Sequence, residues 1–163
     1  MTPDRLRRTM AEFLTGVTVV TTTGLTVPHA MTANAVTSVS LSPPLVLVCV
    51  AHRASFHTAV IASGVWAVSM LSAEQSAVAR HFATSGRDLI TQFDQVPTFL
   101  GATGAPVLSE ANAWLEARTQ QVHEAGDHSI VVGEVVATGV KSVTSGPLAY
   151  HRGSYAAPEG TES

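Results

Sequence analysis

Short runs of apolar and β-branched residues, separated by glycine, proline and other turn formers, recur along the whole chain. Runs of this kind are typical of β-strands. The run over residues 44–51 is almost wholly apolar, which indicates a strand buried on both faces. We predict strands over residues 17–23, 30–40, 44–51, 65–71, 113–122, 129–141 and 147–150. Turn formers over residues 124–127 join two of these strands into a hairpin.

Helical spacing of apolar residues is confined to three short segments. The candidate N-caps are Thr2, Ser55 and Ser72. The first helix has Pro3 in its first turn and ends at Gly16. Its packing face consists of Leu6, Met10, Phe13 and Leu14. The second helix covers residues 56–62, and in the third Gln75 occupies the capping-box position.

Residues 84–109 carry several glycines and prolines and predict a long loop, which in a compact domain is functional or mobile. Strands outnumber helices, so the pattern predicts a mainly β fold, an antiparallel β-barrel with a few short helices. No glycine fingerprint stands between a strand and a helix, which excludes a dinucleotide-binding Rossmann unit. We expect one domain over residues 1–155 and a disordered polar tail over residues 156–163.

Composition limits the partners. Only 13% of the 163 residues are charged while 45% are apolar, so we expect part of the apolar surface to be buried in a homodimer. The formal net charge of −3 and the lack of a basic run argue against nucleic acid. No apolar stretch approaches the roughly 20 residues that span a bilayer. The single cysteine, Cys49, favours the cytoplasm.

The histidines do not form a recognisable metal motif. His123 and His128 stand five residues apart with Gly126 between them, which breaks the helical facing that a zinc protease needs. We therefore predict no metal site. A serine hydrolase is equally disfavoured because the chain has no G-x-S-x-G turn.

Two stretches carry candidate chemistry. Residues 29–42 are rich in hydroxyl and amide side chains, which could wrap a phosphate or a polar ring edge, or could simply face water. His128 follows the turn residues Gly126 and Asp127, where an imidazole could enter a cleft as a donor near neutral pH or could be a half-exposed turn residue.

Four ordered motifs carry a family resemblance. They are FLTGVTVVTT from residue 13, MTANAVTSVSLSPPLVLV from residue 31, GDH at residues 126–128 and PLAYHRGSY at residues 147–155. In this order the chain resembles the flavin reductase-like family of short-chain NAD(P)H:flavin oxidoreductases, which are reductase components of two-component flavin monooxygenases.

The resemblance implies a Greek-key FMN-binding split barrel that is homodimeric and holds flavin near the subunit interface. It further implies FAD or FMN as the flavin and NADH or NADPH as co-substrate. Hydride passes from the nicotinamide to the flavin, and the reduced flavin diffuses to a separate flavin-dependent oxygenase. Two other readings stay open: a flavoprotein that keeps FMN bound and oxidises a small molecule itself, and a non-catalytic flavin carrier.

The resemblance also assigns site residues by position. The cofactor-binding positions are Thr32, Ala33, Asn34, Ala35, Val50, Ala51, Ser55, Phe56, Phe82, Arg87 and Tyr155. Ser55 is the candidate for the flavin phosphate at a helix N-terminus, and Arg87 for the phosphate or adenylate arm. His128 matches the family histidine that positions the nicotinamide. Relatives often have serine where Ala35 stands, and the usual small residue near Trp114 is not evident.

Overall fold

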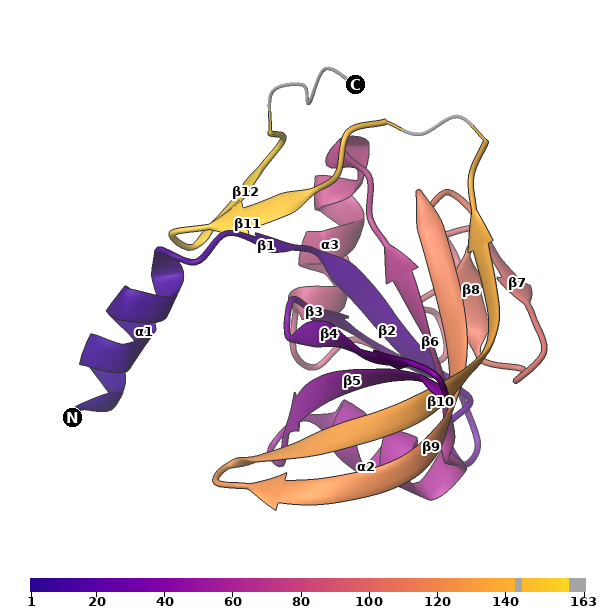
Figure 1. Cartoon of the computed structure of the whole chain (residues 1–163). Helices are drawn as coiled ribbons and strands as arrows, with labels where there is room; N and C mark the ends of the chain where they lie inside the picture. The colour runs from indigo at the N-terminus through magenta and orange to yellow at the C-terminus, as the bar shows by residue number, and fades with distance from the viewer. Residues whose placement is uncertain (143–144, 159–163) are drawn as a thin grey trace.

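A seven-stranded antiparallel sheet organises the chain (Figure 1). The computed structural model describes residues 1–142 and 145–158. Along the sheet the strand order is β3-β2-β6-β9-β10-β5-β4. The strands are β2 (Thr18–Thr22), β3 (His29–Ala33), β4 (Val36–Leu41), β5 (Pro44–Ala51), β6 (Val65–Met70), β9 (Ala113–Ala125) and β10 (His128–Val140). The predicted mainly β architecture is confirmed, including the long β9–β10 hairpin.

The two edges of this sheet meet at one short turn. β3 and β4 lie at opposite ends of the strand order, yet only Asn34 and Ala35 separate them along the chain. Three peptide steps span at most about 11 Å, so the sheet must roll until its edges approach. The edges do not pair with each other, and the barrel is therefore open along this seam. The single strand expected over residues 30–40 is wrong, because the chain crosses the seam there.

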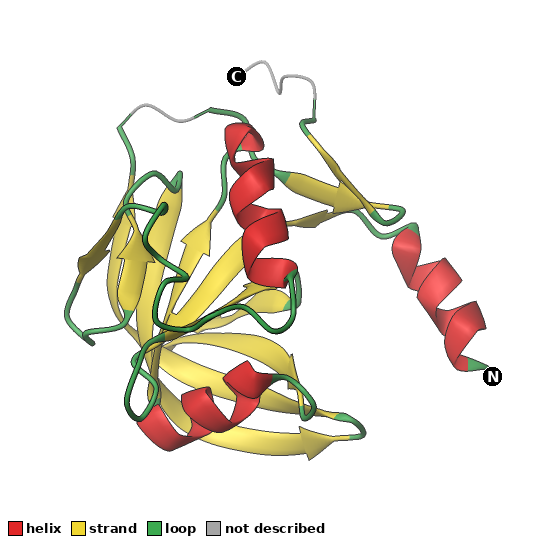
Figure 2. Cartoon of the chain, turned by 180° about the vertical axis from the view of Figure 1, so that it is seen from behind, coloured by secondary structure: helices red, strands yellow, loops and turns green. Residues whose placement is uncertain are grey.

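Both faces of the rolled sheet are covered. The inner core gathers around the fully buried Trp66, with side chains from both edge regions, and α2 (Ser55–Ser63) closes one end. The second core lies on the outer face of β2 and β3, under α3 (Ser76–Ala83). Figure 2 shows the two helices at separate places on the sheet. β3 therefore runs between α2 and α3, which contact it from both sides.

The helix starts are only partly as expected. Thr2 caps α1 (Pro3–Ala11) by accepting a hydrogen bond from the Arg5 backbone N–H, and the Ser72–Gln75 capping box is present. It opens a 3-10 turn, η1 (Ala73–Gln75), which leads into α3. The predicted N-cap Ser55 is wrong: Ala54 is the N-cap of α2 and Ser55 is its first helical residue.

α1 contributes nothing to either core. It ends at Ala11 rather than at Gly16, buries no residue, and projects from the body of the chain (Figure 1). Its expected packing face is exposed, at 52% for Leu6 and 55% for Met10. Phe13 and Leu14, which follow the helix, are equally open. These apolar residues have the predicted spacing, but they pack against no surface of the described residues.

The expected loop over residues 84–109 contains a small hairpin of β7 (Thr98–Leu100) and β8 (Pro106–Leu108). A further small sheet pairs β1 (Thr15–Gly16) with β11 (Ala149–His151) and β11 with β12 (Ser154–Ala156). β11 overlaps the strand predicted over residues 147–150. The other short strands, β1, β7, β8 and β12, are not predicted, because strands of two or three residues leave no periodic signal. β12 includes the first residue of the expected tail, and residues 159–163 of that tail lie outside the described residues.

A buried carboxylate fastens the β7–β8 hairpin. Glu116 is fully buried, and its oxygens accept hydrogen bonds from Ala102 N–H at 2.9 Å and from Thr103 N–H at 2.8 Å. The Thr103 hydroxyl donates a third bond at 2.7 Å. Burial alone raises the pKa of Glu116, but these donors outweigh it, so the pKa lies below its ordinary 4.5.

We expect Glu116→Gln to lower the free energy of unfolding at pH 7 by about 2 kcal/mol, because an amide offers only one oxygen to three donors. Since the folded-state pKa is depressed, the carboxylate stabilises the fold above about pH 4.5 and loses this effect as pH falls through the folded-state pKa. Urea unfolding should show the gap to wild type closing in that window. Glu110→Gln, which removes an exposed ion pair with Lys141, is the control and should cost under about 1 kcal/mol. A Glu116→Gln gap that is independent of pH would contradict the carboxylate's role.

Candidate functional site

A groove of about 540 Å³ follows β3 between the start of α2 and the end of α3. β3 supplies its floor, the turn before α2 supplies one wall, and residues 82–89 supply the other. A second cavity of about 190 Å³ shares Thr32 and Ala83 with the first and extends toward Tyr155. The two cavities are therefore adjacent, on either side of Thr32 and Ala83 near the open seam of the sheet.

One end of the groove is suited to an anion. Ala54, the N-cap of α2, has no side chain that could accept from the first-turn N–H groups, and Ser55 lies exposed beside it. The Arg53 side chain lines the groove and makes no hydrogen bond or ion pair with any described residue. A helix N-terminus, a free hydroxyl and a free guanidinium together make a phosphate-binding arrangement.

Arg87 lines the opposite wall, but its guanidinium is mostly occupied. Nη2 donates to the Ala30 carbonyl at 2.7 Å, and Nη1 donates to the carbonyls of Phe82 (2.9 Å) and Thr84. Only Nε is buried without a partner among the described residues. These bonds tie the end of α3 to β3, so Arg87 builds the wall. Its predicted contact with the phosphate or adenylate arm of the flavin stays a prediction, for which the second N–H of Nη2 has no acceptor among the described residues.

The two phenyl rings that line the groove lie deep in it rather than at its opening. Phe56 and Phe82 line it, yet they are only 2% and 1% exposed because most of each ring packs in the cores. The Arg87 guanidinium lies 5.4 Å from the centre of the Phe82 ring, which fixes both groups.

The seam turn presents Asn34 and the backbone of β3. Asn34 is exposed, lines the second cavity, and donates to the Thr15 hydroxyl at 3.2 Å. The Thr32 hydroxyl donates to the Ala79 carbonyl at 2.6 Å, so it holds α3 against β3. Ala33 is buried in the core, and Ala35 is exposed with its carbonyl accepting from Cys49 N–H at 3.0 Å.

Val50 is not brought to the groove. It is fully buried in the inner core and lines neither cavity. Ala51, the next residue, ends β5 and stands opposite His128 in the β5–β10 ladder.

His128 is the first residue of β10 and lines neither cavity. Its Nδ1 lies 2.7 Å from Asp127 Oδ1, and this bond holds the pKa of Asp127 below its ordinary value. The Asp127 carbonyl also accepts from His52 N–H at 3.0 Å, which fixes the hairpin tip to the turn before α2. With Nδ1 bonded to a carboxylate, Nε2 is the nitrogen left to face a ligand.

The second cavity has an aromatic side. The rings of Tyr150 and Tyr155 lie 5.5 Å apart, and the Arg80 guanidinium lies 5.4 Å from the Tyr155 ring centre. Burial is the main cause that raises the pKa of Tyr155, so its phenol stays neutral at physiological pH. This side can stack against a flat ring and offer a hydroxyl to it.

The sequence model of the Flavin reductase like domain matches residues 10–159. The chain belongs to the flavin reductase-like family. Among its relatives, the NADH-dependent FAD reductase of Streptomyces globisporus is 49% identical over 134 residues, which is 81% of this chain and 73% of that protein. The chain spans about half of a longer relative, a probable flavin reductase of Rhizobium meliloti (strain 1021), with 40% identity and 49% of that protein covered.

Solved structures of the family have the same fold. The NADH:FAD oxidoreductase SgcE6 of Streptomyces globisporus C-1027, in complex with NAD and FAD fragments, superposes with a TM-score of 0.87 at 43% identity, covering 96% of this chain and 93% of that one. BorF, the flavin reductase component of a bacterial two-component tryptophan halogenase, gives a TM-score of 0.88 at 43% identity, covering 95% and 97%.

Within this flavin reductase-like site, the sequence missed Arg53 and Tyr150. An arginine immediately before a predicted helix start is a usable signal for Arg53, since the helix N-terminus already favours an anion. Tyr150 has no such signal, because only the β11–β12 pairing places it beside Tyr155. No group of three or more His, Cys, Asp or Glu in the described ranges is arranged to hold a metal ion.

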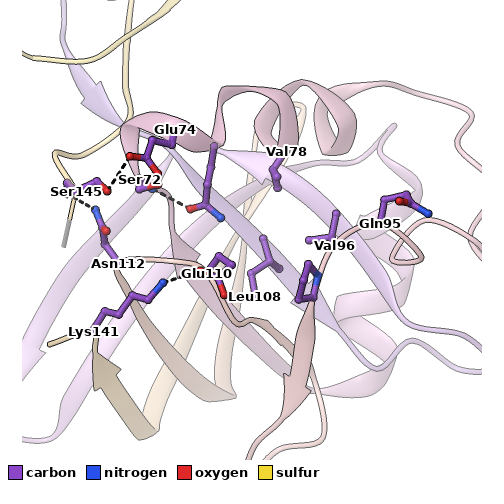
Figure 3. Close-up of a pocket in the computed structure, with 12 residues that line it drawn as sticks. Ser72, Glu74, Val78, Gln95, Val96, Leu108, Glu110, Asn112, Lys141 and Ser145 are labelled. Atoms are coloured by element: carbon purple, nitrogen blue, oxygen red, sulfur yellow. Dashed lines mark hydrogen bonds and ion pairs between the residues drawn. The ribbon is translucent and has the colours of Figure 1, made fainter. Parts of the chain in front are cut away.

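A third cavity of about 310 Å³ lies apart from all the predicted site residues (Figure 3). Its polar side carries the Lys141–Glu110 ion pair, with Nζ and Oε2 2.7 Å apart, and Asn112, which donates to the Ser145 carbonyl at 2.8 Å. Val78, Val96 and Leu108 form its apolar side. The polar groups largely satisfy one another, and none of the predicted site residues lines this cavity.

Proposed function

We propose that this chain is an NAD(P)H:flavin oxidoreductase that reduces FAD or FMN and supplies the reduced flavin to a separate monooxygenase component. The observation that carries the proposal is the seam groove, in which a phosphate-binding end and a flat, partly aromatic end share β3 as their floor. Relatives named as NADH-dependent reductases favour NADH as the reductant.

Flavin, when bound, accepts the hydride that the nicotinamide donates. The residues of this chain would bind the flavin and the nicotinamide and orient them toward each other. Arg53, Ser55 and the first-turn N–H groups of α2 would hold the phosphate, and Asn34 with the β3 backbone would meet the polar edge of the ring. His128, oriented by Asp127, would position the nicotinamide. The reaction needs no covalent nucleophile.

The exposed wall of the groove favours a flavin that exchanges. Ala83, Thr84, Ser85 and Gly86 line the groove and are all exposed, so no side-chain layer covers that side. A flavin bound there could leave without local unfolding. This arrangement supports a diffusible product more than a permanently bound cofactor.

A homodimer is part of the proposal. α1 buries none of its residues, and the exposed apolar side chains Leu6, Met10, Phe13, Leu14 and Leu41 lack a partner surface within the described chain. Large apolar side chains exposed in this number support a protein–protein interface. A second copy of the chain would cover these side chains and could approach the seam through the exposed β4.

The proposed compartment is the cytoplasm, which supplies reduced nicotinamide and keeps thiols such as that of the free Cys49 reduced. No helix among the described residues is long and apolar enough to cross a membrane.

We expect His128→Ala to raise the Michaelis constant for NADH about tenfold while the dissociation constant for flavin changes less than about twofold. The reason is that His128 lines neither cavity, while the adjoining Asp127 is bonded through its carbonyl to His52 in the turn that carries Arg53. Steady-state assays with NADH varied at saturating FMN give the first constant, and flavin fluorescence titration gives the second. Equal loss of flavin binding would contradict the assignment, and His123→Ala, on the exposed part of the same hairpin, is the matched control.

A further inference from the structure

A polar cluster of four side chains links the hairpin tip to the turn before α2. Ser129 is fully buried and directly follows His128. Its Oγ lies 2.8 Å from His57 Nε2 and 3.2 Å from His52 Nε2, and it donates to Glu124 Oε1 at 3.1 Å. Glu124 Oε2 lies 2.9 Å from His52 Nε2, and the two imidazole rings meet edge to face with centres 5.0 Å apart.

The number of hydrogen-bond donors and acceptors determines which group donates to which in this cluster. A serine hydroxyl donates once and accepts twice. Since the Ser129 hydroxyl donates to Glu124, both histidines must donate to it through Nε2–H, and His52 shares its proton with the second Glu124 oxygen. The Ser129 hydroxyl then has one acceptor and two donors, so the cluster has a single hydrogen-bonding arrangement and is rigid.

The cluster is interleaved with the functional groove. Between His52 and His57 the chain contributes Arg53, Ser55 and Phe56 to the groove lining. On the other strand, Ser129 adjoins His128. The cluster therefore joins the anion-binding end of the groove to His128.

On the β9 side, few contacts hold this part of the hairpin in place. Residues 120–127 are exposed, and beyond Thr119 β9 pairs only with β10. On the β10 side, pairing with β5 as far as His128 fixes the backbone. The His128–Asp127 bond and the cluster around Ser129 are the polar contacts that then hold the side chains at the tip.

We propose that Ser129, with His52, His57 and Glu124, is a positioning network that sets His128 against the anion-binding end of the groove, and so determines affinity for the nicotinamide dinucleotide. This inference rests on the proposed reductase function. None of the four residues needs to touch either substrate. Their effect passes through the orientation of His128, which distinguishes the network from a further binding site.

The test is a double-mutant cycle between Ser129 and His128. Ser129→Ala should raise the Michaelis constant for NADH about five- to tenfold at nearly unchanged kcat and flavin affinity, and should add nothing in the His128→Ala background. Ser69→Ala is the matched control, because Ser69 is also a fully buried strand serine with one hydrogen bond, which its Oγ accepts from Leu108 N–H at 3.0 Å. It should leave the constant for NADH unchanged.

A surface variant keeps the test independent of folding. The Glu124 side chain is 74% exposed, so Glu124→Gln should fold. It should still weaken the hydrogen bonds around Ser129 and raise the Michaelis constant for NADH about threefold. Glu134→Gln, on the same hairpin and also in a hydrogen bond, is its control. Full additivity of Ser129→Ala with His128→Ala, or an equal effect in the controls, would overturn the network. If wild type shows no flavin-dependent NADH oxidation, the proposed function fails instead.

Discussion

Replacing Ala83 by tryptophan will weaken FMN binding by about 100-fold or more while the protein stays folded. Ala83 ends α3, is exposed, and is one of two residues that line both cavities of the seam groove. An indole at this position fills the junction through which any ligand must run from the anion-binding end to the aromatic end. Because the side chain starts from the surface, it need not displace the core.

Fluorescence titration of FMN and FAD measures the effect, and thermal unfolding reports whether the fold survives. Ala77→Trp is the matched control, since Ala77 is exposed on the same helix but lines none of the three cavities. It should bind flavin as wild type does. Unchanged FMN affinity in a folded Ala83→Trp protein would place the flavin elsewhere.

Replacing Gly133 by valine will lower the free energy of unfolding by about 3 kcal/mol or more. A Cβ at this position would lie 2.7 Å from Trp66 Cζ2 and 3.0 Å from the Ala117 Cβ. Trp66 is fully buried at the centre of the inner core, so its ring cannot move aside without opening a cavity. The absence of a side chain in β10 is what lets the indole lie across the sheet.

Urea denaturation of Gly133→Val, with Gly16→Val as control, checks this expectation. A Cβ at Gly16 meets nothing within 4 Å, so the control should change stability by no more than about 0.5 kcal/mol. Similar stabilities for the two variants would show that the inner core tolerates rearrangement around Trp66.

The strands of the rolled sheet were predictable because each carries its own periodic signal. β2, β6 and the β9–β10 hairpin stand close to where their residue patterns put them, and β5 stands where its apolar run did, although its burial alternates rather than being complete on both faces. The seam was not predictable in the same way. Residues 30–40 look like one strand, and only the pairing of β3 with β2 and of β4 with β5 reveals that the chain changes sheet edge at Asn34.

The site residues show the same division between local and non-local information. Ser55 and Phe56 could be placed near a helix start from their neighbours, although the cap itself is Ala54. Whether Arg53 or Arg87 is free to meet a ligand depends on which carbonyls lie nearby, and one that Arg87 bonds, that of Ala30, comes from a distant part of the chain. The spacing of residues in the sequence does not indicate which arginine is free.

Buried polar groups were the least accessible to sequence reasoning. Glu116 lies in an ordinary strand pattern. Nothing near it in the sequence predicts that loop N–H groups will donate hydrogen bonds to it. Ser129 likewise has partners that come from β9 and from the region around α2. Both residues act through contacts that form only when the sheet is rolled.

The most direct test of the account is NADH oxidation by the purified and dialysed protein with and without added flavin, followed by the loss of NADH absorbance. A flavin reductase with an exchangeable flavin should be colourless after dialysis, inactive with NADH alone, and active once FAD or FMN is added, and Ala83→Trp should lose that activity. A protein that stays yellow and is not stimulated by added flavin, or that never oxidises NADH, would contradict it.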